Sequence, residues 1–379
     1  MITSLRAVLV AVSVATLLAA CSDDSTPESE PSDEPPTSSA PASPSDPASS
    51  RSTGVPEPRV AGTIATGFTS PWDIAFLPDG DALVSERDTG LIKRVTPDGE
   101  VTTVGELPEV APSSEGGLLG LTVHPDFETE PYVYAYLSTD SDNRLVRMRW
   151  DGERLGDPEV LLDDNPVGEI HDGGRLAFGP DGKLYVTTGE TGNDELSQDL
   201  DSNGGKILRL EPDGDIPPDN PFPDSPVWSY GHRNVEGLAF DDSHRLWASE
   251  FGDATWDELN LIEPGDNYGW PLREGDEGES CDCIDPVEQW STDDASPSGL
   301  AYADGALWMA ALAGQRLWRI DIDGDHTIGE PNDYFTGEYG RLRAIAAAPD
   351  GSLWLATSNT DGRGDPASDD DRILRIELS

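Results

Sequence analysis

The sequence predicts an all-β protein, a six-bladed β-propeller with four-stranded antiparallel blades. Three observations predict this fold: an apolar hairpin phrase recurs along residues 55–379, a third strand follows each copy, and no segment shows helical periodicity over three turns. Sheets arranged radially bury both faces and leave only short edges. A β-sandwich is the structural alternative, but it explains neither the sixfold recurrence nor the length.

The recurring phrase is an apolar strand that ends in a Pro-Asp-Gly or equivalent turn and is followed by a second apolar strand, which is the pattern of a β-hairpin. Its six copies begin at Ala75, Thr122, Ala177, Ala239, Ala301 and Ala346. Asp79 and Asp350, in the first and last turns, are 271 residues apart. The mean spacing is therefore about 54 residues, longer than the roughly 40–50 of common propeller repeats, which leaves room for inserted loops.

Each hairpin is followed by a third strand rich in Arg, Leu and Ile. The six segments are 91–95, 144–150, 206–212, 258–264, 316–322 and 372–378. In a propeller the functional site lies where loops converge at one end of the central channel. We therefore expect the informative residues in the loops between repeats, and not in the hairpin turns that every blade shares.

The N-terminal residues are typical of targeting and linker sequence. Residues 1–20 carry Arg6 and an apolar run that is too short to span a bilayer but suits a signal-peptide core. The run ends in Leu-Ala-Ala-Cys at Cys21, which resembles the lipobox of bacterial lipoproteins; an ordinary secretory signal is the alternative. Residues 21–54 are almost all Ser, Pro, Thr, Ala or acidic and predict a disordered tether to the domain at 55–379. We expect an extracytoplasmic protein attached to the cell membrane only through a lipid on Cys21.

The charge balance excludes one class of partner. The chain has 24 Lys and Arg against 74 Asp and Glu, a formal net charge of −50. Binding of nucleic-acid phosphates requires clustered cations, so we expect no nucleic-acid partner. Besides Cys21, the only cysteines are Cys281 and Cys283, which in an exported chain can form a tight loop disulfide and alone make a poor metal site.

Several polar side chains directly precede predicted inner strands. His171 and His232 occupy equivalent positions in successive repeats, whereas His124 and His244 lie within hairpin turns. The other polar residues at such positions are Arg233, Asn234, Arg341 and Arg343. Guanidinium groups beside an amide and an imidazole can bind an anionic or quinonoid oxygen. The alternative is that these arginines pair with carboxylates of the blades.

The segment 249–271 mixes carboxylates, glycine turns and exposed carbonyls, which are the oxygen ligands that hard cations such as calcium prefer. No part of the chain resembles a Ser-His-Asp nucleophile setting, a Walker loop or a dinucleotide-binding glycine motif. The sequence therefore favours a site built from arginines, histidine and a cation over nucleophilic or nucleotide chemistry.

Taken together, eight motifs resemble the glucose/sorbosone dehydrogenase family, soluble aldose dehydrogenases that use pyrroloquinoline quinone (PQQ) and calcium on a six-bladed propeller. The resemblance covers nearly all of residues 60–378. In the family's order the motifs are SPWDIAFLPDG, EGGLLGLTVHPDF, HDGGRLAFGPDGKLYVTTGE, GGKILRLEPDGDIPPDNPF, YGHRNVEGLAFD, DELNLIEPGDNYGWP, SPSGLAY and RLRAIAAAPDG.

The resemblance implies roles for particular residues. His171 matches the catalytic base that takes the proton from the sugar's anomeric hydroxyl while hydride passes to the quinone, and Glu115 falls at a substrate-contacting position. The residues that match quinone contacts are Arg233, Asn234, Arg341 and Arg343. Gly252 and Asp253 fall where two backbone carbonyls hold the catalytic calcium. Glu258 and Tyr268 fall near a second, structural calcium.

The expected function is PQQ-dependent oxidation of aldose sugars to lactones, with an electron acceptor that the sequence does not identify. The departures from the family are Ala313 where a quinone-holding lysine is expected, Asp253 for a proline, Phe251 for a polar residue and Ile170 for an acid. Ala313 and Phe251 favour, as the alternative, a propeller that has lost the cofactor and binds sugars or cell-wall glycans. A calcium-dependent hydrolase such as a lactonase is a third hypothesis, by analogy of fold alone.

Overall fold

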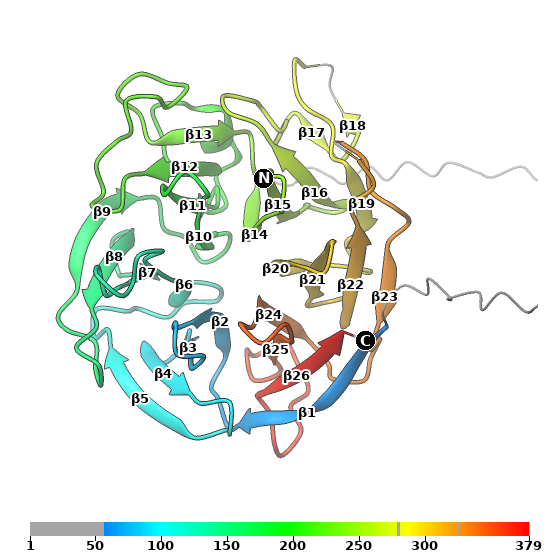
Figure 1. Ribbon diagram of the computed structural model, residues 1–379. Helices are drawn as coiled ribbons and strands as arrows, with labels where there is room; N and C mark the ends of the chain where they lie inside the picture. The colour runs from blue at the N-terminus through cyan, green and yellow to red at the C-terminus, as the bar shows by residue number, and fades with distance from the viewer. Residues whose placement is uncertain (1–56, 279–280, 325, 379) are drawn as a thin grey trace, which may run out of the picture. The chain divides into compact units, whose positions relative to one another are not determined.

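The computed structural model describes residues 57–278, 281–324 and 326–378. They form six four-stranded antiparallel sheets set radially around an axis (Figure 1), which confirms the predicted propeller. Within these residues the one helical segment is a short 3₁₀ turn, η1 (Asp194–Gln198), and no helix there could cross a membrane. The predicted signal peptide at 1–20 and the tether at 21–54, with Cys21, lie outside the described residues.

The first three blades follow one another along the chain, each running from the axis outward. Blade one consists of β2 (Pro71–Phe76), β3 (Ala82–Glu86), β4 (Leu91–Val95) and β5 (Val101–Glu106). Blade two consists of β6 (Leu118–Val123), β7 (Tyr132–Ser138), β8 (Asn143–Arg149) and β9 (Glu159–Asn165). Blade three consists of β10 (Leu176–Phe178), β11 (Leu184–Thr188), β12 (Lys206–Leu210) and β13 (Val227–Tyr230).

The next two blades keep this order, with one insertion. Blade four consists of β14 (Asn234–Phe240), β15 (Leu246–Phe251), β16 (Trp256–Ile262) and β19 (Glu288–Ser291). Between its last two strands stands a small hairpin of β17 (Arg273–Glu274) and β18 (Glu277–Gly278), followed by a disulfide between Cys281 and Cys283. Blade five consists of β20 (Pro297–Ala303), β21 (Ala306–Ala311), β22 (Arg316–Asp321) and β23 (Asn332–Tyr334).

The sixth blade closes the ring with strands from both ends of the domain. It consists of β24 (Leu342–Ala347), β25 (Leu353–Thr357), β26 (Arg372–Leu378) and, outermost, β1 (Pro58–Thr66). β1 pairs antiparallel with β26, from Pro58 opposite Leu378 to Thr66 opposite Arg372. The first strand of the domain therefore holds the last blade to the first, because the chain continues from β1 directly into β2.

A separate hydrophobic core lies between each pair of neighbouring blades. Between blades one and two, for example, Leu83 and Ile92 pack with Leu118 and Val133, and all four side chains are fully buried. Burial of each such side chain stabilises the fold by roughly 1.5–3 kcal/mol. The turns that the sequence repeats also behave as predicted: Gly80 of the first Pro-Asp-Gly turn has φ +91°, a conformation that glycine adopts freely.

The innermost strands β2, β6, β10, β14, β20 and β24 surround the axis (Figure 1). β10 has only three residues, because the chain before it turns sharply. His171, Gly173 and Gly174 all have positive φ, of 60°, 65° and 103°. A Cβ on Gly173 would lie 2.7 Å from the backbone of Thr188, so glycine is required there. This turn sets the position of His171 at one end of the axis.

Candidate active site

Loops that precede the inner strands, together with the β15–β16, β21–β22 and β25–β26 loops, enclose a cavity of about 310 Å³ at one end of the axis, here called the axial cavity. Its walls come from blades two to six. The predicted site residues that line it are Glu115, His171, Arg233, Asn234, Gly252, Asp253, Arg341 and Arg343. Residues more than 200 positions apart in the sequence thus share one cavity, as the repeat pattern led us to expect.

His171 is fixed by carboxylates on two sides. Its backbone N–H donates to Glu115 Oε2 at 2.8 Å, and its ring Nδ1 makes a short contact with Glu190 Oε1. Glu190 is only 1% exposed, and His171 is 9% exposed. A carboxylate on Nδ1 stabilises the tautomer that carries its proton there, which leaves Nε2 as the nitrogen able to accept a proton. The non-glycine positive φ of His171 is a strained conformation of the kind found at active sites.

The equivalent histidine of the next blade has a different environment. His232 is fully buried, and its two ring nitrogens lie 2.8 Å from Glu250 Oε1 and 2.8 Å from Ser229 Oγ. Its ring also stacks on Tyr268, with centroids 4.7 Å apart. Because both nitrogens are bonded and no face is open, His232 supports the packing of blade four and is not available for chemistry.

The three predicted arginines are already paired with carboxylates. Arg343 Nη1 lies 2.7 Å from Glu236 Oε2, Arg341 Nε lies 3.0 Å from Asp361 Oδ2, and Arg233 Nη2 lies 3.1 Å from Asp253 Oδ1. These are the carboxylate pairs that the sequence left open as an alternative.

These carboxylate pairs leave some N–H donors of the three arginines without an acceptor. Each guanidinium has five N–H groups, and the buried Nε atoms of Arg233 and Arg343 have no hydrogen-bond partner. Burial lowers the pKa of Arg343, although Glu236 opposes this shift. Burial would raise the pKa of Asp361, but Arg341 and Arg343 hold it below its usual value. The guanidinium groups of Arg233 and Arg343 therefore still have N–H donors for a further acceptor.

Arg363 is a fourth guanidinium that the sequence did not reveal. Its Nη1 donates to Glu115 Oε1 at 2.7 Å and its Nη2 donates to Ser114 Oγ at 3.1 Å, and its side chain is 47% exposed. Burial would raise the pKa of Glu115, but the N–H of His171 and the guanidinium of Arg363 lower it. Glu115 is therefore an ionised group at the cavity rim with both oxygens engaged.

The loop between β15 and β16 forms another wall. Gly252 N–H donates to Asp257 Oδ1 at 2.9 Å, and a Cβ on Gly252 would lie 1.8 Å from the carbonyl oxygen of Trp256, so glycine is required. Burial raises the pKa of Asp257 to about 6. Within the described ranges, no group of three or more His, Cys, Asp or Glu side chains is placed to hold a metal ion. A cation bound here would therefore depend on backbone carbonyls.

Glu258 and Tyr268, predicted near a second calcium, lie outside the cavity within blade four. Glu258 accepts hydrogen bonds from Asn260 Nδ2 at 3.0 Å and from the N–H of Gly275 at 2.7 Å. Burial and the neighbouring Glu250 raise the pKa of Glu258 to about 8. Tyr268 Oη donates to the carbonyl of Leu261 at 2.8 Å. Their association with a second ion stays a prediction.

Three of the four departures noted in the sequence line the cavity; Ile170 is not among its lining residues. Phe251 and Ala313 both line it, and no lysine is among its lining residues. The buried Lys206 is engaged elsewhere, because its Nζ donates to the carbonyls of Leu196, Ser197 and Gly204. Arginine is thus the only cationic residue type in the described walls of the cavity.

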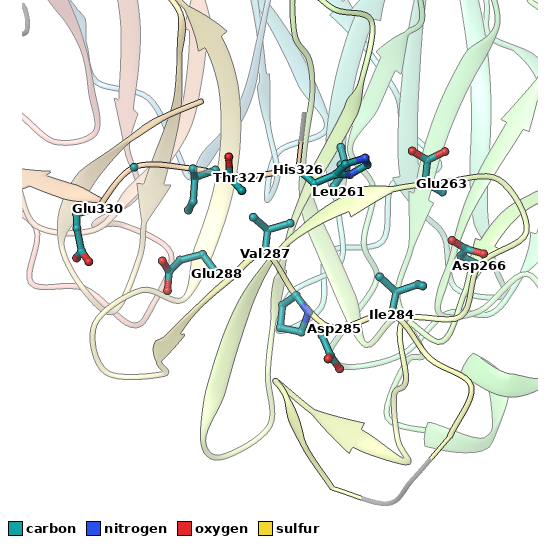
Figure 2. Close-up of a pocket in the computed structure, with 13 residues that line it drawn as sticks. Leu261, Glu263, Asp266, Ile284, Asp285, Val287, Glu288, His326, Thr327 and Glu330 are labelled. Carbon is teal, nitrogen blue, oxygen red and sulfur yellow. The ribbon is translucent and has the colours of Figure 1, made fainter. Parts of the chain in front are cut away.

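A larger cavity, of about 620 Å³, lies on the outer side of blade four (Figure 2). Its charged lining is acidic, and Figure 2 shows the carboxylates of Glu263, Asp266, Glu288 and Glu330 around it. No arginine or lysine is among the described residues that line it. A cavity of this charge suits a cation rather than an anionic ligand, so size alone does not identify the site.

Comparisons with known proteins agree with the choice of the axial cavity as the candidate active site. A family model described as glucose/sorbosone dehydrogenase matches residues 68–374. The solved structure of the PQQ-bound aldose sugar dehydrogenase from Streptomyces coelicolor is 57% identical, with a TM-score of 0.82, and the match covers 85% of this chain and 98% of that one. Aldose sugar dehydrogenase YliI of Escherichia coli is 30% identical over 77% of this chain and 88% of its own length. Quinoprotein glucose dehydrogenase B of Acinetobacter calcoaceticus is 35% identical, over 64% of this chain and 59% of its own.

Proposed function

This chain belongs to the glucose/sorbosone dehydrogenase family, and we propose that it oxidises aldose sugars to lactones with PQQ bound in the axial cavity. One observation carries the proposal: guanidinium groups of blades four and six line the same cavity as the imidazole of His171. The Streptomyces coelicolor relative binds PQQ, and this chain matches almost its whole length.

The residues present fit such a cofactor. PQQ is a planar tricyclic quinone with three carboxylates, which requires fixed cationic donors around a flat cavity. Arg341 and Arg343 from blade six and Arg233 from blade four supply these donors, and two of them carry buried N–H groups without a partner. Asn234 Oδ1 accepts from the N–H of Gly173, which leaves the amide N–H groups of Asn234 for a quinone oxygen. Arg363 offers a further cation in the wall of the same cavity, which has no lysine among its described lining residues.

The chain's own residues then perform the proton chemistry. When bound, PQQ supplies the acceptor for the hydride that leaves the anomeric carbon. His171 Nε2 takes the proton of the anomeric hydroxyl, and Glu190 stabilises the imidazolium that results. Glu115, held by Arg363 and by the backbone of His171, orients the sugar at the cavity rim. The hydroxyl loses a proton and the carbon a hydride, so the product is the lactone.

Calcium belongs to the same proposal. The carbonyls of Gly252 and Asp253 would hold it, because hard cations accept backbone oxygens and this loop borders the cavity. A calcium ion held there would supply Lewis-acid chemistry at the quinone. The proline-to-aspartate change at Asp253 leaves its carbonyl in place.

Reconstitution tests the proposal. Purified residues 55–379, supplied with calcium and PQQ, should reduce a redox dye in the presence of aldoses, and His171→Gln should abolish turnover without changing the melting temperature. Absence of activity together with absence of PQQ binding would defeat the proposal. Equal loss of stability and activity in His171→Gln would mean that the histidine is structural.

A second candidate function is a cofactor-free propeller that binds sugars or cell-wall glycans. Ala313 and Phe251 in the cavity wall favour it, because both replace polar groups with apolar ones. Isothermal titration calorimetry separates the two functions: saccharide affinity without PQQ affinity supports the binding protein, and PQQ affinity supports the enzyme.

We also propose that the enzyme acts outside the cytoplasmic membrane, held by a lipid on Cys21 and by the tether at 21–54. The apolar run that ends at Cys21 supports this location. Incorporation of a palmitate analogue into the wild type but not into Cys21→Ala is the expected result. Equal recovery of both proteins from the soluble fraction would contradict the anchor.

A further inference from the structure

The loop after β15 wraps around a single carboxylate oxygen. Glu274 Oε1 accepts hydrogen bonds from four consecutive backbone N–H groups, those of Asp253, Ala254, Thr255 and Trp256, at 2.8, 2.8, 2.7 and 3.1 Å. Glu274 is therefore the shared acceptor of the whole loop.

The carboxylate is brought to the loop by the insertion in blade four. Glu274 ends β17, and the next two N–H groups are anchored: Gly275 donates to Glu258 Oε1 at 2.7 Å and Asp276 donates to Gln289 Oε1 at 2.9 Å. Both acceptors belong to β16 or β19, the outer strands of the blade. The hairpin thus holds Glu274 against the blade, so that its carboxylate is a fixed partner for the loop.

Peptide geometry connects Glu274 to the proposed calcium ligands. A trans peptide is planar, with its N–H and C=O pointing in opposite directions. The N–H of Asp253 shares a peptide with the carbonyl of Gly252, and the N–H of Ala254 shares one with the carbonyl of Asp253. Since both N–H groups point at Glu274, both carbonyls point away from it. Hydrogen bonds to an anion also polarise these peptides and make their oxygens better ligands.

These hydrogen bonds compensate for the replacement of the family's Gly-Pro by Gly252-Asp253 in this chain. A proline at Asp253 would fix φ near −65° but would have no N–H. Asp253 lacks that restriction and instead donates its N–H to Glu274. On the other side, Gly252 N–H donates to Asp257. The carboxylates of Asp257 and Glu274 therefore restrain the backbone of this loop, which a proline ring would otherwise restrain.

We propose that Glu274 is the positioning residue of the calcium loop, aiming the carbonyl oxygens of Gly252 and Asp253 at the ion without binding it. This inference rests on the proposed function. Groups that orient metal ligands from behind change metal affinity by about 10- to 100-fold when removed. Calcium affinity should therefore fall by that factor in Glu274→Ala, and less in Glu274→Gln, which keeps an acceptor oxygen but loses the charge.

Calcium titration of the PQQ-free protein by calorimetry tests the proposal. The matched control is Glu277→Gln, an exposed glutamate of the same hairpin, which should bind calcium as the wild type does. With calcium and PQQ saturating, Glu274→Gln should regain the wild-type kcat, because only the affinity for the ion is changed. Amide exchange of residues 253–256 in calcium-free Glu274→Ala should be faster than in the wild type.

The outcomes separate this inference from the function on which it rests. Wild-type calcium binding with unchanged affinity in Glu274→Ala would overturn the role of Glu274 alone and leave the enzymatic proposal standing. Absence of calcium binding in the wild type would overturn the role of Glu274 and the metal part of the proposed function together. A lowered kcat at saturating calcium would also overturn the inference, since it would place Glu274 in the chemistry itself.

Discussion

The contact between His171 and Glu190 leads to a quantitative prediction about kcat. Glu190→Gln keeps the shape of the side chain and removes its charge opposite Nδ1. Both residues are at least nine-tenths buried, so water does not replace the lost partner. A hydrogen bond to a charged group contributes about 1.5–3 kcal/mol, and each 1.36 kcal/mol is tenfold in rate, so kcat should fall by roughly 10- to 150-fold.

The assay is steady-state dye reduction by the calcium- and PQQ-loaded enzyme, with KM and kcat determined separately. The loss should appear in kcat, because Glu190 acts on the proton acceptor and does not contact the sugar. Glu195→Gln, at an exposed position in η1, is the matched control and should retain full activity. A kcat within twofold of the wild type in Glu190→Gln would refute the assignment of His171 and Glu190 as a working pair.

Three further predictions concern stability and the metal loop. Burial raises the pKa of Asp172 to about 6, so the native state binds one more proton than the unfolded state between about pH 4 and 6. The unfolding free energy of the wild type, relative to that of Asp172→Asn, should therefore fall by up to about 3 kcal/mol as the pH rises from about 4 to 6. Urea denaturation measures this difference, and a difference that does not change with pH would contradict the prediction. Gly252→Ala places a Cβ 1.8 Å from the carbonyl oxygen of Trp256, so calorimetry should show calcium affinity reduced about tenfold or more; unchanged affinity would contradict the loop assignment. A chain that begins at residue 67 lacks β1 and the closure of the ring, so it should melt at least about 5 °C below a chain that begins at residue 57; coincident melting curves would show that closure is dispensable.

The repeat was sufficient to predict the blades because its signals are local. A Pro-Asp-Gly turn such as that at Gly80 specifies a hairpin from a few neighbouring residues. The ring closure was not predictable in this way. β1 pairs with β26 at the far end of the chain, and its own alternation of side chains does not indicate a partner.

The site was predicted in part, for similar reasons. His171 was singled out by its place in the repeat, but the repeat makes His232 its equivalent, and the structure is needed to show that both ring nitrogens of His232 are bonded within its blade. Glu190 had a signal that was missed: it is the last residue of the recurring hairpin phrase in its copy, as Glu250 is in the next, and each carboxylate contacts the histidine of its own blade.

Arg363 and Glu274 had no comparable signal. Both come from loops outside the recurring hairpin phrase, and each acts through a contact with another loop. Residues of this kind become visible only once the blades bring the loops together, since neither spacing nor residue type marks them in the sequence.

A crystal structure of the protein with PQQ and calcium would test the proposed PQQ site most directly. We expect PQQ in the axial cavity, with its carboxylates in contact with Arg341 and Arg343 and its quinone oxygens beside Arg233 and Asn234. We expect His171 Nε2 to face the anomeric hydroxyl of a sugar placed against the quinone. An empty axial cavity at saturating PQQ, or PQQ bound elsewhere on the propeller, would contradict the proposed site.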